Sequence, residues 1–118
     1  MTRALLALLL MLPIRVEACQ TALLLAMDVS NSVDAGEYRL QMDGLAAALT
    51  DPEIAEILVR DRVKLSVMQW SGEDRQDVSI PWTQMLSPAH VAGMSVRVRG
   101  LERAFVLSNT APGEALRV

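Results

Sequence analysis

The stretch TALLLAMDVSNS (residues 21–32) decides the fold of this 118-residue chain. Its first seven residues form an apolar run that, by propensity alone, fits a helix as well as a strand. The run is short and ends directly in a polar Asp-x-Ser-x-Ser loop, which favours a central parallel strand with continuous apolar residues. We therefore expect a strand buried on both faces at 21–27, with Asp28 at its carboxyl end.

Two helices are predicted after this loop. Asp34 and Glu37 stand three residues apart as a capping pair, and apolar residues then follow at spacings of four, three and four. The inward face of this first helix is expected to consist of Tyr38, Met42, Leu45 and Leu49. Asp51 as N-cap and Pro52 at the first helical position begin a shorter helix. Its apolar side is expected to consist of Ile54, Ile57 and Leu58.

A strand hairpin and a last helix complete the pattern. Alternating apolar residues from Val63 predict a strand that ends at Trp70, and the polar turn at 71–75 leads into a second arm over 78–82. Pro81 marks that arm as an edge strand, because proline has no N–H to donate. We expect Trp70 and Trp82 to be structural core residues. Ser87 and Pro88 begin a helix with three inward residues, namely Val91, Met94 and Val98.

This order of elements predicts the fold class. One domain is expected, because 118 residues are too few for two separate cores. A parallel strand pair bridged by helices, plus an antiparallel edge strand, corresponds to the N-terminal half of a doubly wound, mostly parallel, Rossmann-like α/β sheet. Such sheets bind ligands at the carboxyl ends of their strands, where Asp28 is placed.

The net charge of the chain indicates which partners it can bind, and its N-terminal sequence indicates where in the cell it is found. The net charge of −3 comes from interspersed acids and bases, so the chain lacks the basic stripe that nucleic-acid binding requires. Arg3, the apolar run 4–12 and Pro13 predict a signal peptide over residues 1–18, too short in its apolar part to span a bilayer. We therefore expect an exported protein, periplasmic or secreted. Contact with the membrane is expected only through this peptide or through a lipid anchor.

Cys19, the single cysteine, would follow the cleavage site, and its state is left open. Lipidation is the less favoured alternative because Glu17 fits a lipobox poorly, and a free thiol or an intermolecular disulfide are the others. The single histidine, His90, is expected to be a solvated surface residue, because zinc binding and catalysis each need companions in sequence.

The candidate metal ligands are Asp28, Ser30 and Ser32. Alternate residues of an extended backbone point to one side, so one carboxylate and two hydroxyls can converge on one point. Oxygen ligands of this kind select a hard cation such as Mg²⁺ or Mn²⁺, and the remaining coordination positions would stay open. The same residue types are also ordinary capping and turn residues, so the pattern by itself does not decide between these alternatives. Catalysis by Ser30 is disfavoured because no G-x-S-x-G elbow surrounds it.

Several segments together resemble a known family. Residues 25–34 and 37–41, the Asp-Pro-Glu at 51–53, and the stretches 69–72 and 81–83 are similar to the DUF1194 family of uncharacterised exported bacterial proteins. That family is in turn similar to von Willebrand factor A (vWA) domains. The resemblance covers Cys19 to about Leu116 and is weak between Ser87 and Ser108.

The resemblance implies a metal site of the vWA type. Asp28, Ser30 and Ser32 match the first metal loop of that superfamily, and residues 109–113 are similar to the second, in which the Thr110 hydroxyl approaches the metal. The third loop of the superfamily supplies another aspartate after a further strand, and Val118 ends the chain before it. We therefore expect 19–118 to be a partial vWA-like domain, with Mg²⁺ or Mn²⁺ binding weak or absent, since affinity for hard cations follows ligand charge.

The function implied is a non-enzymatic, metal-dependent, adhesion-type module that binds a protein ligand through an acidic residue. A phosphohydrolase with Asp28 as nucleophile is one alternative, although such enzymes generally carry a second aspartate where this chain has Ser30. A nonfunctional truncated remnant is the other alternative.

Overall fold

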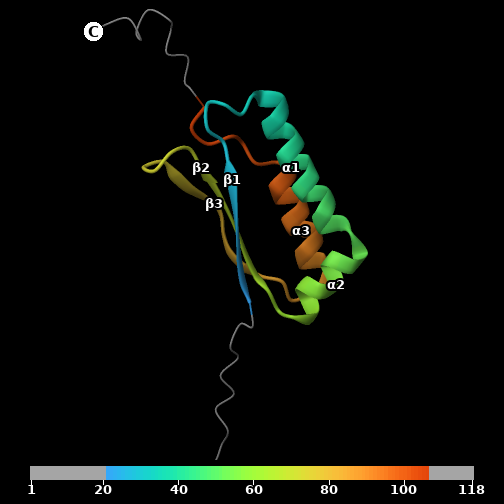
Figure 1. Cartoon of the computed structure of the whole chain (residues 1–118). Coiled ribbons are helices and arrows are strands. Elements are labelled where there is room, and N and C mark those ends of the chain that lie inside the picture. The colour runs from blue at the N-terminus through green and yellow to red at the C-terminus, as the bar shows by residue number, and fades with distance from the viewer. Residues whose placement is uncertain (1–20, 107–118) are drawn as a thin grey trace, which may run out of the picture.

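The computed structural model describes residues 21–106 and has an α/β architecture (Figure 1). The elements in chain order are β1 (Ala22–Asp28), α1 (Ala35–Thr50), α2 (Pro52–Arg60), β2 (Lys64–Trp70), β3 (Gln76–Gln84) and α3 (Pro88–Arg99). This confirms the predicted order, including the short second helix. The predicted signal peptide, Cys19 and Thr110 lie outside the described residues. Within them, no helix has both the length and the apolar character needed to cross a membrane.

The three strands form one mixed sheet in the order β1-β2-β3. β1 runs parallel to β2, with Leu25 opposite Val67 and Asp28 opposite Trp70. β2 and β3 form the predicted antiparallel hairpin, whose register shifts twice along its length. Pro81 lies on β3 at the edge of this sheet, as predicted. The arrangement is consistent with one half of a Rossmann-like sheet.

Each helix begins at the residue that its sequence predicts. The Asp34 carboxylate accepts a hydrogen bond from the Glu37 N–H, and the Glu37 carboxylate accepts one from the Asp34 N–H, both at 2.8 Å. This is a complete capping box. Asp51 caps α2 and Ser87 caps α3, each followed by a proline at the start of the helix. The proline costs nothing there, because the first N–H of a helix has no partner within it.

The core lies between the sheet and the helices, which cover one of its faces (Figure 1). Tyr38, Met42 and Leu49 on α1 are buried as predicted, and Leu45 is half-buried. α1 and α3 pack closely, and the buried Ser95 hydroxyl donates a 2.7 Å hydrogen bond to the Ala46 carbonyl oxygen. The remaining large core residues of α3 and the sheet are Val91, Met94, Val98, Leu65, Val67 and Ile80.

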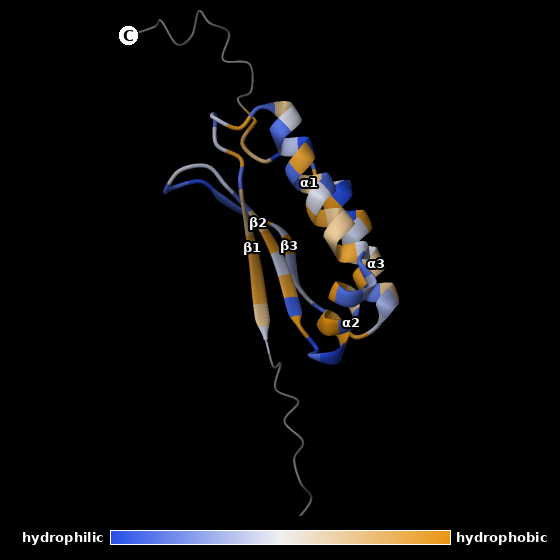
Figure 2. Cartoon of the chain, turned by 45° about the vertical axis from the view of Figure 1, so that its right-hand side comes forward, coloured by the Kyte–Doolittle hydropathy of each residue, from blue (hydrophilic) through white to orange (hydrophobic). Residues whose placement is uncertain are grey.

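The opposite face of the sheet is open, which corrects two predictions (Figure 2). β1 is not buried on both faces: Leu24 is 44% exposed, while Leu25 and Met27 pack against the core. Trp82 is not a core residue, since it is 51% exposed, and Trp70 is only half-buried. The physical reason is that all the described helices lie on one side, so side chains that alternate toward the other side meet no second layer.

The predicted apolar side of α2 is also partly wrong. Leu58 is buried, but Ile54 and Ile57 are exposed, and Ala55 and Val59 pack against the core in their place. The inward stripe of this helix is therefore rotated from the prediction by about one residue position. Bulk and hydropathy favoured the isoleucines, whereas the direction in which α2 leaves α1 determines which side meets the core.

Candidate metal centre

The loop after β1 is fixed by backbone hydrogen bonds at the carboxyl end of the sheet. The Val29 N–H donates to the Trp70 carbonyl oxygen at 2.9 Å, which extends the parallel pairing one residue beyond Asp28. The Val33 N–H donates to the Ser30 carbonyl oxygen at 2.9 Å and closes a turn. The Val29 side chain is buried. The backbone that carries the candidate ligands is thus anchored at both ends.

Asp28, Ser30 and Ser32 lie together on this loop. The Ser30 N–H donates to the Asp28 Oδ1 at 2.9 Å, and the hydroxyls of Ser30 and Ser32 are 3.2 Å apart. Hydrogen bonds from the Ser30 hydroxyl and from its backbone N–H lower the pKa of Asp28 below its usual value. The carboxylate therefore stays charged into more acidic conditions than usual. The fourth predicted ligand, Thr110, lies outside the described residues.

The oxygen donors on this loop fit a hard cation, but they carry little charge. Asp28 supplies one carboxylate, and Ser30 and Ser32 supply neutral hydroxyls. The Asp34 carboxylate next to them is engaged in capping α1. Within residues 21–106, no three acidic, histidine or cysteine side chains gather in a way that could hold a metal ion. A cation held here would keep most of its waters, as Mg²⁺ commonly does in proteins.

A segment after α3 lies against the loop, and the buried residue that holds it was missed by the sequence analysis. The Gln69 amide nitrogen donates to the Ser79 hydroxyl at 2.9 Å and to the Glu102 carbonyl oxygen at 3.0 Å. The Gln69 amide oxygen accepts from the Ala104 N–H at 2.9 Å. The Tyr38 hydroxyl donates to the Leu101 carbonyl oxygen at 2.9 Å. We call residues 101–105 the strap.

Arg103 connects the strap to the candidate metal loop. Its Nη2 donates to the carbonyl oxygens of Val29 and Ser30 at 2.8 and 2.9 Å. Its Nε is buried and has no hydrogen-bond partner among the described residues. Together with Asn31, Val33 and Val106, it lines a hollow of about 170 Å³. Because Arg103 occupies these two carbonyl oxygens, the loop offers a cation mainly side-chain oxygens, and the guanidinium adds a positive charge that favours anions nearby.

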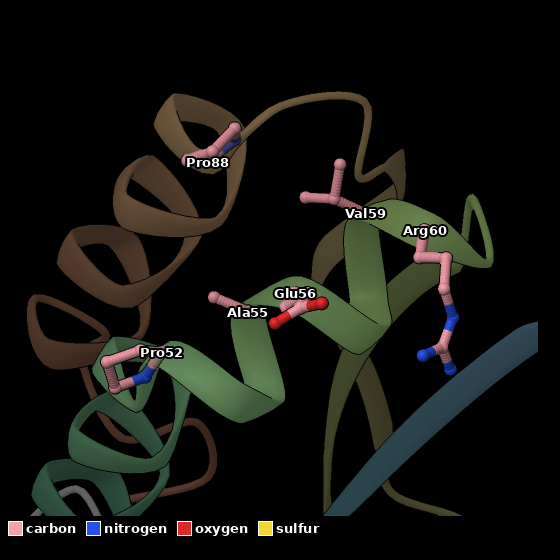
Figure 3. Close-up of a pocket in the computed structure, with 6 residues that line it drawn as sticks. All are labelled: Pro52, Ala55, Glu56, Val59, Arg60 and Pro88. Atoms are coloured by element: carbon pink, nitrogen blue, oxygen red, sulfur yellow. The ribbon is translucent and has the colours of Figure 1, made fainter.

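The larger hollows lie elsewhere. One of about 460 Å³ is lined by Pro88 at the start of α3 and by five residues of α2, which include Glu56 and Arg60 (Figure 3). Figure 1 places α2 at the other end of the sheet from the carboxyl end of β1, where Asp28 lies. His90 borders a second hollow beside β3, and its Nδ1 accepts a hydrogen bond from the Leu86 N–H at 3.2 Å. His90 is exposed, as predicted.

Tyr38 gives the strap a measurable pH dependence. Burial raises its pKa above the ordinary value of about 10, because a phenolate in this position would lose its hydration, although the charges of Arg39 and Arg103 oppose the shift. The pKa of Tyr38 in the folded protein then exceeds its pKa in the unfolded chain. The stability that the buried neutral phenol contributes is therefore fully present below pH about 10, and it is lost as the pH rises through the pKa of the folded state. We expect the melting temperature to fall in this alkaline range.

Tyr38 is the only tyrosine in the chain, so phenolate absorbance during an alkaline titration reports on this residue alone. We expect its midpoint to lie above that of the urea-unfolded chain. The Tyr38→Phe variant should lack this contribution to the alkaline decrease in melting temperature. Equal midpoints in the folded and unfolded chains would contradict the prediction.

Comparison with known proteins gives one match. The family model described as "Protein of unknown function (DUF1194)" matches residues 18–118, a span that includes Asp28, Ser30, Ser32 and Thr110. No curated protein and no solved structure matches the chain. Because the match covers most of the sequence, the chain belongs to the DUF1194 family.

Proposed function

We propose that this protein is a non-enzymatic, metal-dependent binding module of the vWA type, exported from the cytoplasm. Asp28, Ser30 and Ser32 would present Mg²⁺ or Mn²⁺ to an acidic side chain of a protein partner. The observation that carries the proposal is the placement of these oxygen donors on one anchored loop at the carboxyl end of β1, with a hydrogen-bonded carboxylate of lowered pKa. Thr110, from the segment similar to the second metal loop, would add a further hydroxyl.

The surroundings of the loop favour an anionic partner. Arg103 hydrogen bonds to the backbone of Val29 and Ser30, and α1 begins at Ala35 with the positive end of its dipole near the loop. Both positive charges repel a metal ion that binds alone, and both attract the carboxylate of a partner that would complete the coordination of the metal. We therefore expect weak metal binding by the protein alone and tighter binding when an acidic ligand is present.

Thermal unfolding of the full chain in EDTA and in excess Mg²⁺ or Mn²⁺ tests the proposal. A cation that binds only the folded state raises stability by RT ln(1 + [L]/Kd), about 2.7 kcal/mol at a hundredfold excess over Kd. We expect a metal-dependent rise in melting temperature that Asp28→Asn abolishes. Asp43→Asn, the same change at an exposed position of α1, should leave the rise intact.

An unchanged metal response in Asp28→Asn, or no response in the unmodified protein even with a carboxylate ligand such as glutarate present, would overturn the proposal. Metal-dependent hydrolysis of a generic phosphate ester that disappears in Asp28→Asn would instead support the phosphohydrolase alternative.

A further inference from the structure

The hollow between β3 and α3, which His90 borders, has a volume of about 420 Å³ and shares no residue with the candidate metal loop. This volume is within the range of small-molecule sites in proteins. β3 is the strand farthest from β1, whereas the doubly wound order adds further strands beyond β1, so the hollow does not lie where they would add. Two lining residues belong to β3 and five to α3, namely Thr83, Gln84, Ala89, His90, Gly93, Met94 and Arg97.

The floor of the hollow is apolar and lies at a gap between side chains of α3. Gly93 has no side chain, and a Cβ atom at this position would meet nothing within 4 Å. Met94, the next residue, is buried, and Ala89 adds only a methyl group. An elongated apolar group can therefore lie against this part of the helix.

Two hydrogen-bond donors stand at the two ends of this gap. His90 and Arg97 are seven residues apart, so they project from the same side of α3 and are separated by about 10 Å along its axis. The His90 Nδ1 accepts a hydrogen bond from the Leu86 N–H at 3.2 Å, so the proton of the neutral ring is on Nε2. The ring can then donate to a ligand through Nε2, and Arg97 can donate through its guanidinium fork.

The charge around the hollow selects an anion. None of the described residues that line it is acidic, and Arg97 is exposed. The helix α3 carries Arg97 and Arg99 in its last turn and has no acidic residue along its length. A guanidinium matches the two oxygens of a carboxylate, and no carboxylate of α3 competes for this one.

We propose that this hollow is a binding site for an elongated organic acid. Arg97 binds the carboxylate at one end of the ligand, and the apolar middle of the ligand lies over Gly93 and against Met94. The Nε2 of His90 donates to a hydrogen-bond acceptor at the other end. The site requires no metal ion. Because the ligand is small and the hollow is open to solvent, we expect a Kd of about 1 mM.

Backbone amide NMR of the full chain in EDTA, titrated with suberate, tests this inference independently of any metal. Suberate is a dicarboxylate whose six methylene groups separate its ends by a distance similar to that between His90 and Arg97. We expect saturable shifts of the Gly93 and Arg97 amides. Glutarate, with three methylene groups, cannot reach both donors and should bind at least about tenfold more weakly, because it loses one charge-assisted hydrogen bond.

Two variants with matched controls locate the ligand. Arg97→Gln should weaken suberate binding at least about tenfold, whereas Arg99→Gln, the same change outside the hollow, should not. Gly93→Leu should fill the hollow and abolish binding, whereas Gly44→Leu should not, although a Cβ atom at Gly44 on α1 also meets nothing within 4 Å. Both leucine variants should fold, because leucine has a higher helix propensity than glycine, and circular dichroism checks this.

Four results would overturn the inference. The first is the absence of saturable shifts at suberate concentrations up to about 50 mM, and the second is a set of shifts confined to residues 28–32. The third is glutarate binding as tight as suberate binding, which would show that the two ends of the hollow do not act together. The fourth is equal weakening of suberate binding by Arg97→Gln and Arg99→Gln.

Discussion

Replacing Gln69 by alanine is expected to lower the free energy of unfolding by about 2–4 kcal/mol. The side chain is almost completely buried and makes three hydrogen bonds, two of them to the backbone of the strap. Alanine would leave the Ala104 N–H and the Glu102 carbonyl oxygen without their partner, and an unsatisfied polar group costs more than its hydrogen bond contributes. Urea denaturation followed by circular dichroism measures the change.

Gln76→Ala is the matched control, because Gln76 is exposed at the start of β3. It should change stability by no more than about 0.5 kcal/mol. Hydrogen exchange of the Ala104 amide provides a second readout, since release of the strap should accelerate it in Gln69→Ala. Similar stability losses in the two variants would contradict the role of Gln69 in holding the strap.

Leu65→Ala is expected to destabilise the fold by about 2–5 kcal/mol, the range found when a fully buried leucine is truncated. Leu65 lies on the central strand and has no exposed surface, so its removal leaves a cavity between the sheet and the helices. For a domain of this size, each kcal/mol corresponds to roughly 4 °C in melting temperature.

Leu40→Ala makes the same change on the exposed side of α1 and should be nearly neutral. Calorimetric melting of both variants under identical conditions gives the comparison. The expected decrease in melting temperature is therefore about 8–20 °C, and a decrease of only about 2–3 °C for Leu65→Ala would contradict the described packing.

Local sequence signals predicted the elements well. The starts of α1, α2 and α3 follow from Asp34, Asp51 and Ser87, because capping and proline effects act over only three or four residues. The inward residues of α1 and α3 follow from helical spacing for the same reason. The parallel placement of β1 beside β2 could be inferred from the apolar run and the intervening helices.

Burial across the sheet could not be predicted in the same way. The continuous apolar run of β1 indicated two covered faces, but coverage depends on where helices distant in sequence are placed. Trp82 shows the same problem, since its side chain is 51% exposed although it lies within strand β3. An apolar side chain indicates which positions can be buried, and tertiary structure determines which of them are.

The candidate site was predicted in part. Asp28, Ser30 and Ser32 are close in sequence, and a turn after β1 keeps Ser30 within hydrogen-bonding distance of both of the others. Their role as metal ligands stays a prediction. Gln69 and Arg103 contact partners more than thirty residues away, and no local pattern marks such contacts. One signal for Gln69 was present: it continues the alternate series Val63, Leu65 and Val67, so it is a polar residue at a core position.

The pairing of Asp28 with Trp70 across the parallel strands gives the protein an intrinsic optical reporter. Adjacent residues of paired strands project to the same face, so the half-buried indole lies alongside the candidate ligand. The only other tryptophan, Trp82, is on β3 and largely exposed. With Trp82 replaced by phenylalanine, the emission of Trp70 alone would register a change of charge or hydration at Asp28, without any attached label.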